Sequence, residues 1–119
     1  MQTALVLGAI FMFLAVAIGA FGAHALKEKL AGDAGKNYGT GVLYHLIHGV
    51  AMIAVGAAAG VQPSSLLNAA VWVFAVGIIL FSGSLYALSL TGIRKLGAVT
   101  PLGGLAFLAG WVLVAIAAL

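Results

Sequence analysis

The chain has 119 residues, of which 65% are hydrophobic and only 6% are charged, and its mean hydropathy is +1.27. A soluble domain carries about 25% charged residues, so the composition excludes a soluble globular protein. The absence of cysteine excludes disulfides and thiolate metal sites. The net charge of +3 comes from five basic and two acidic residues, which are too few and too scattered for a nucleic-acid-binding surface.

The first predicted element covers residues 3–26, which contain no formal charge. This length exceeds the ~20 apolar residues that cross a bilayer as a helix. The segment has no basic residues before it and is longer than the apolar region of a secretory signal. We therefore expect a permanent membrane helix rather than a cleaved signal peptide.

Three further apolar elements follow, at residues 41–60, 65–90 and 96–119. The stretch VQPSS, residues 61–65, separates the second element from the third, because proline followed by serines is typical of a turn. The sequence thus predicts an all-α, polytopic membrane protein with four transmembrane helices in one domain, residues 1–119.

Small residues recur every seven positions in each predicted helix. The sets are Gly8, Ala15 and Gly22; Gly49 and Gly56; Ala70, Gly77 and Ser84; and Gly103, Gly110 and Ala117. Small residues let membrane helices approach closely. A period of seven favours left-handed packing with crossing angles near about +20°. We therefore expect a compact left-handed four-helix bundle.

The basic residues predict the orientation in the membrane. Lys27, Lys29 and Lys36 lie in the first loop, and Arg94 and Lys95 lie in the third, whereas the termini and the second loop have no basic residue. Loops rich in Lys and Arg face the cytoplasm. Loops one and three are therefore predicted to be cytoplasmic, with both termini outside.

Polar side chains gather in the half of the predicted bundle that is nearer the basic loops. The candidate site residues are His24, Tyr44, His48, Ser82, Tyr86 and Thr100, with His45 beside them. At 100° per residue, Tyr44, His45 and His48 share one face of the second helix, whereas Ser82 and Ser84 point to different faces of the third. We refer to this group as the polar layer.

The residues leave several roles open for the polar layer. The simplest is hydrogen bonding between helices, at about 0.6 kcal/mol per pair. Three others need a ligand: a metal or haem bound by His45 and His48, a proton or ion relay in an oligomer, or a lipid or quinone headgroup. In the last case Lys27, Lys29, Arg94 and Lys95 would attract the lipid phosphate. Because no span holds a carboxylate, a catalytic serine is disfavoured.

Four motifs cover nearly the whole chain: GAFGAHALK (residues 19–27), TGVLYHLIH (40–48), LFSGSLY (80–86) and GAVTPLGGLAFLAGW (97–111). With these motifs the chain resembles the YgdD/YwdK-like family of small membrane proteins, known as domain of unknown function 423. The resemblance implies four spans and a bacterial inner (plasma) membrane location, but no activity. It also implies that His24, His48, the SGSLY segment and the TPLGG segment belong to the family pattern. His45 departs from that pattern, since relatives often carry glutamine there, which disfavours a metal pair.

The sequence therefore predicts a structural or interaction-mediating membrane protein rather than an enzyme, with no cofactor and no nucleic-acid partner. Membrane lipids are the expected partners. Glycine stripes can pack within or between chains, so the sequence also leaves open a homo-oligomer or another membrane protein as a partner.

Overall fold

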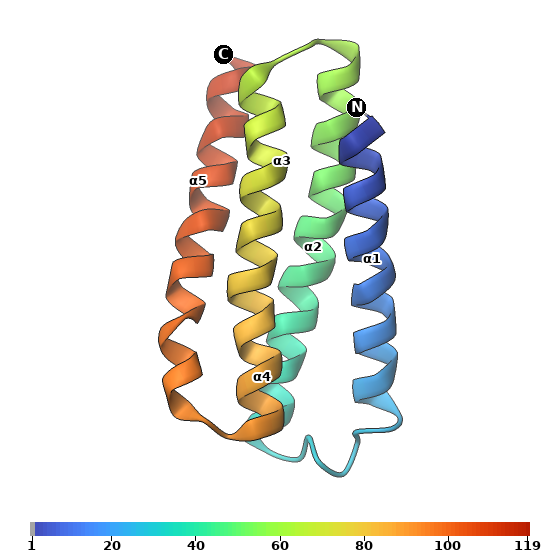
Figure 1. Cartoon of the computed structure of the whole chain (residues 1–119), viewed down its shortest axis with the longest axis vertical. Helices are drawn as coiled ribbons and strands as arrows, with labels where there is room; N and C mark the ends of the chain where they lie inside the picture. The colour runs from blue at the N-terminus through green and yellow to red at the C-terminus, as the bar shows by residue number, and fades with distance from the viewer. Residues whose placement is uncertain (1) are drawn as a thin grey trace.

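The computed structural model describes residues 2–119 and is mainly helical, with no strand among these residues. Its four spans are long and apolar enough to cross a membrane, which confirms the predicted fold class. The elements are α1 (Gln2–Ala23), α2 (Asp33–Val61), α3 (Ser65–Gly77), the π-helical segment η1 (Ile78–Ser82), α4 (Gly83–Thr91), the 3₁₀ segment η2 (Arg94–Ala98) and α5 (Thr100–Ala118). The third span is continuous through α3, η1 and α4, as Figure 1 shows.

The first loop is shorter than the sequence suggested. Helix α1 ends at Ala23 rather than at residue 26, and α2 begins at Asp33 rather than at residue 41. Gly32 adopts a φ of 69°, a left-handed conformation that glycine tolerates, and the chain enters α2 directly after it. Asp33 then places a carboxylate in the first turn, where the helix dipole favours negative charge. Lys36 consequently lies on α2 and not in the loop.

The other turns follow the expected turn chemistry. Before α3, the Ser64 hydroxyl accepts a hydrogen bond from the Leu67 backbone N–H at 3.2 Å, a serine N-cap. After α4, Gly92 has a φ of 72°, and its N–H donates to the Leu88 carbonyl at 2.8 Å, as in a left-handed helix end. Helix α2 thus ends at Val61 and α3 begins at Ser65, and the third span ends with α4 at Thr91.

The helices pack mainly on their neighbours along the chain. Helix α1 packs against α2, α2 against the third span, and the third span against α5. Figure 1 shows α1 and α5 at opposite edges of the molecule, with both chain ends at the top. The molecule is therefore a compact but flattened bundle, 47 × 26 × 17 Å in extent.

The small residues lie at these helix contacts, as predicted. A Cβ atom on Gly49 would come 2.6 Å from the Met12 sulfur of α1, and one on Gly110 would come 2.5 Å from the ring of Phe74. Real Cβ atoms do not approach so closely, so a larger residue at either position would force its neighbour to shift. These glycines pack within one chain; the predicted left-handed crossing stays a prediction.

A feature that the sequence did not predict is the π-helical segment η1 in the middle of the third span. The Gly83 N–H bonds back to the Ile78 carbonyl, five residues earlier instead of four. Such a wide turn changes the direction in which the following side chains point, and π segments are frequent at functional sites. Here it presents Ser82 to α2 and Phe81 to α5, as the contacts below show.

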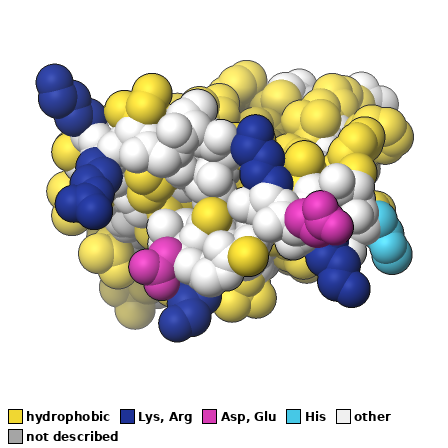
Figure 2. All heavy atoms as spheres, turned by 90° about the horizontal axis from the view of Figure 1, so that it is seen from below, with side chains coloured by type: hydrophobic (Ala, Val, Ile, Leu, Met, Phe, Trp, Pro, Cys, Tyr) yellow, Lys and Arg dark blue, Asp and Glu magenta, His cyan; other side chains and the backbone are white. Residues whose placement is uncertain are grey.

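All the basic side chains lie at one end of the molecule, which we call the basic end. Figure 2, seen from below, shows the Lys, Arg, Asp and Glu side chains spread over this end between apolar ones. Lys27, Lys29, Arg94 and Lys95 are all exposed there. The two termini are at the opposite end (Figure 1). This arrangement fits the predicted orientation, but which end is cytoplasmic stays a prediction.

Candidate functional site

His48 connects α2 to α5 through its imidazole ring. Its Nδ1 lies 2.8 Å from the Tyr44 carbonyl oxygen, and the Trp111 Nε1–H donates to its Nε2 at 3.0 Å. An indole can only donate and a carbonyl can only accept. The two partners therefore assign a neutral ring with the proton on Nδ1, and they leave neither nitrogen free for a metal.

Rings from α2, the third span and α5 surround His48. We call this group the aromatic cluster; its members are Tyr44, His48, Phe74, Phe81, Phe107 and Trp111. The imidazole lies flat on Phe107, with centroids 3.6 Å apart and planes 8° apart, and Tyr44 stacks on Phe81 at 4.6 Å. Trp111 packs against the fully buried Phe74 at 4.8 Å. Such contacts add about 0.5–1.5 kcal/mol per pair beyond area burial.

His45 belongs to a different set of contacts, although it is only three residues from His48. Its Nδ1 lies 2.8 Å from the Tyr86 hydroxyl of α4, and its ring packs edge-on against Phe11 of α1. Its Nε2 is buried and has no hydrogen-bond partner among residues 2–119. The two histidines therefore engage different helices, and in the described part of the chain no three His, Cys, Asp or Glu residues form a metal site.

The hydroxyl groups of the polar layer form two further interhelical contacts. The fully buried Ser82 donates to the Gly41 carbonyl of α2 at 2.7 Å. Ser84 donates to the Phe81 carbonyl at 2.9 Å, which leaves it to accept from Thr100 of α5. Thr100 thus pairs with Ser84 and not with a residue on the helix face of Ser82. The helix pattern had placed Ser84 only among the small packing residues.

The structure therefore divides the predicted polar layer into separate contacts. Ser82 and Tyr86, on the third span, form hydrogen bonds to α2. His48 of α2 bonds instead to α5, and Thr100 of α5 bonds to the third span. His24 is exposed in the turn after α1, and within residues 2–119 its side chain has no hydrogen bond to the other residues of this layer. Phe74, Phe81 and Phe107 were not predicted as partners of His48, because a phenylalanine on a membrane helix is most often lipid-facing or core.

Beside the aromatic cluster runs an open groove of about 580 Å³ between α2 and α5, which we call the α2–α5 groove. Phe81 of η1 lines it between the two helices, and Tyr44 and His48 line it on α2. On α5 the lining residues are Pro101, Gly104, Leu105, Phe107, Leu108 and Trp111. All of them lie on membrane-spanning segments, so the groove opens toward the hydrocarbon region.

Comparison with known proteins identifies the family. The model of a family described as "Protein of unknown function (DUF423)" matches residues 18–104. The UPF0382 membrane protein YwdK of Bacillus subtilis is 44% identical over 119 residues, which cover 99% of this chain and 97% of the relative. The UPF0382 membrane protein SH2409 of Staphylococcus haemolyticus is 43% identical over 116 residues, covering 98% and 94%. The chain therefore belongs to the DUF423 family, as its motifs suggested; no solved structure matches it.

Proposed function

We propose that this member of the DUF423 family is a membrane-embedded binding protein whose α2–α5 groove takes a ligand from within the bilayer. In this proposal the polar layer is structural and holds the two walls of the groove at a fixed separation. The observation that carries the proposal is the Trp111–His48 hydrogen bond, which joins α5 to α2 beside the groove. The bond orients both rings so that their faces form part of the wall.

A binding role fits the polar groups better than catalysis does. A catalytic histidine needs a ring nitrogen that can exchange a proton with a substrate, but both nitrogens of His48 already have partners. The hydroxyls of Ser82 and Ser84 donate to backbone carbonyls. The chain's two acidic residues, Glu28 and Asp33, lie at the basic end, so neither can orient a histidine within the bilayer.

The protein is further proposed to reside in a bacterial plasma membrane with its basic end in the cytoplasm. The support is the separation of all five basic residues from both termini. With this orientation, the part of the groove next to Pro101 belongs to the cytoplasmic leaflet.

Native mass spectrometry of the detergent-purified protein tests the binding role. Gly104 lines the groove, and a Cβ atom on it would lie 3.9 Å from the Phe81 ring, an ordinary contact. Gly104→Leu should therefore fill the groove without disturbing the helix contact. We expect the wild-type protein to retain a bound membrane component and Gly104→Leu to lose at least about 90% of it, since a filled pocket excludes its ligand.

Ala109→Leu is the matched control, because Ala109 is an exposed residue of the same helix that does not line the groove. It places the same leucine side chain on the lipid-facing surface instead of in the groove. Equal retention by both variants, or a wild-type protein without a bound component, would contradict the proposed function.

A further inference from the structure

The length of the α2–α5 groove matches one leaflet of a bilayer. On α5 the lining residues extend from Pro101, in the first turn, to Trp111. The ten helical steps from Pro101 to Trp111 correspond to about 15 Å at a rise of 1.5 Å per residue. The hydrocarbon core of a bilayer is ~30 Å thick, so the groove runs from the basic end to about the middle of the membrane.

The inner part of the groove, around His48 and Trp111, offers mainly apolar surface, and Tyr44, which also lines the groove, lies one helical turn nearer the basic end. Its polar atoms there belong to His48 and Trp111, which satisfy each other, and the imidazole is covered on one face by Phe107. Leu105 and Leu108 complete the wall and are largely exposed. A ligand with a polar group at this depth would lose its hydration without gaining a partner. The inner part therefore suits a hydrocarbon chain.

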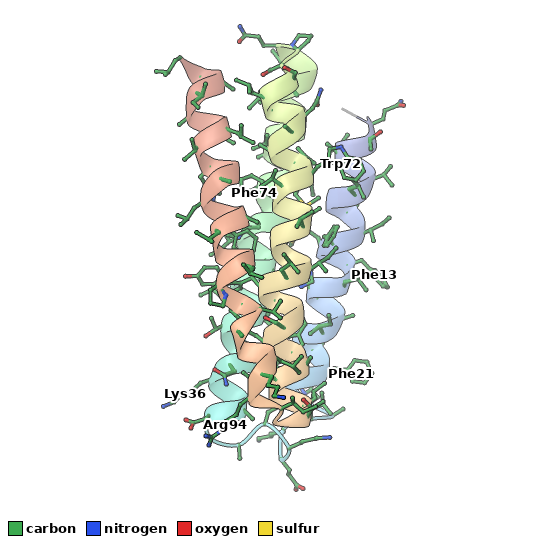
Figure 3. The ribbon with its side chains drawn as sticks, turned by 60° about the vertical axis from the view of Figure 1, so that its left-hand side comes forward. Phe13, Phe21, Lys36, Trp72, Phe74 and Arg94 are labelled. Atoms are coloured by element: carbon green, nitrogen blue, oxygen red, sulfur yellow. The ribbon has the colours of Figure 1, made fainter. Side chains whose placement is uncertain are left out.

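The outer part of the groove ends close to positive charge. Arg94 and Lys95 are exposed in η2, the segment that leads directly into α5 and its Pro101. Lys36 is exposed on the first turn of α2, the other wall helix. Figure 3 shows Lys36 and Arg94 at the same lower end of the molecule. Basic side chains at a membrane surface attract anionic lipids.

We infer that the α2–α5 groove binds one acyl chain of an anionic phospholipid from the leaflet at the basic end, with the lipid phosphate beside Arg94 and Lys95. This inference rests on the proposed function and specifies its ligand. The groove has the length of an acyl chain, its inner end is apolar, and basic residues lie near its outer end. These three features together suit an amphiphile with one negative headgroup.

Fluorescence quenching of Trp111 tests the inference directly. The other tryptophan, Trp72, lies on α3 and lines different hollows beside α1, so Trp72→Phe leaves Trp111 as the single reporter. The protein is placed in nanodiscs of phosphatidylcholine that contain a minor fraction of a lipid brominated on its acyl chains. This lipid is either phosphatidylglycerol or phosphatidylcholine, at the same fraction.

We expect brominated phosphatidylglycerol to quench Trp111 at least about twofold more strongly than brominated phosphatidylcholine, because the basic residues enrich the anionic lipid. The double variant Arg94→Gln/Lys95→Gln should remove this difference. Gly104→Leu should reduce quenching by both lipids, whereas Ala109→Leu should change neither. Leu108→Phe, at the exposed rim of the groove, is a second filling variant if Gly104→Leu does not fold.

Other results would overturn the inference in distinguishable ways. Equal quenching by both lipids that is still sensitive to Gly104→Leu would show a chain site without headgroup preference, and the proposed binding function would stand. Quenching that neither filling variant changes would exclude a lipid chain from the groove. If a crosslinked dimer then formed through Leu108→Cys, the occupant would be a second copy of the chain.

Discussion

His48 stabilises the contact between α2 and α5, because each of its two hydrogen-bond partners can act in only one way, as donor or as acceptor. The Tyr44 carbonyl can only accept and the Trp111 indole can only donate, so the ring keeps one tautomer and one orientation. Serine would have no ring to stack flat on Phe107, as the imidazole does. The histidine therefore contributes both a hydrogen bond and a packing surface at one point of the bundle.

At this scale we expect measurable coupling between His48 and Trp111. In a double-mutant cycle of His48→Ala and Trp111→Phe, the coupling free energy of unfolding in detergent should be about 0.6 kcal/mol and at most ~1.7 kcal/mol. His48→Ala alone should also lower the melting temperature. Tyr86→Phe, which removes the partner of His45 instead, should add independently to Trp111→Phe. A melting temperature unchanged by His48→Ala would show that the bond does not hold the helices.

At the scale of the elements, the contact between the third span and α5 depends on a glycine opposite the π-helical segment. A Cβ atom on Gly103 would come 2.7 Å from the Cα atom of Phe81, in η1. Backbone atoms cannot move aside as a flexible side chain can. The wide turn of η1 and the absence of a side chain at Gly103 therefore act together to bring the two helices into contact.

Gly103→Ala should accordingly lower the free energy of unfolding by about 1–3 kcal/mol, the usual cost of overpacking. Gly83→Ala is the matched control, because no atom lies within 4 Å of a Cβ built there. It should be neutral or stabilise the protein by up to about 1 kcal/mol through its higher helix propensity. Chemical denaturation in mixed micelles measures both. Equal effects of the two variants would mean that the helices can separate at little cost.

The same scale shows what sequence patterns can and cannot predict. The spans could be predicted because crossing hydrocarbon requires about 20 apolar residues, and the different directions of Ser82 and Ser84 followed from helical periodicity. The pairing of Thr100 with Ser84 could not, since it depends on how α5 is rotated against the third span. The segment η1 had no local signal either, because its residues IILFS are equally compatible with an α-helix.

At the scale of the whole molecule, the distribution of charge and the number of spans determine the topology. Four spans return the chain to the side on which it began, so both ends lie opposite the basic end (Figure 1). All five Lys and Arg residues fall at the basic end, and two acidic residues accompany them without cancelling the excess. This asymmetry is what orients short membrane proteins during insertion.

Reporter fusions in bacteria test this orientation. A reporter that is active only outside the cytoplasm should work when fused after Leu119 and fail when fused after Gly92, in the third loop. A reporter that is active only in the cytoplasm should give the opposite pattern and serves as the control. Activity of the cytoplasmic reporter at Leu119 would reverse the orientation and would move the basic end to the outer leaflet.

The packing of each helix on its neighbour along the chain has a consequence for assembly. Each span finds its main contact surface in the one synthesised just before it: α2 on α1, the third span on α2, and α5 on the third span. Domains generally fold from the amino terminus during synthesis, and here no span waits for a distant one. The Trp111–His48 bond, between residues 63 positions apart, can form only when α5 has entered the membrane. It therefore reports that the fourth span has packed onto the second.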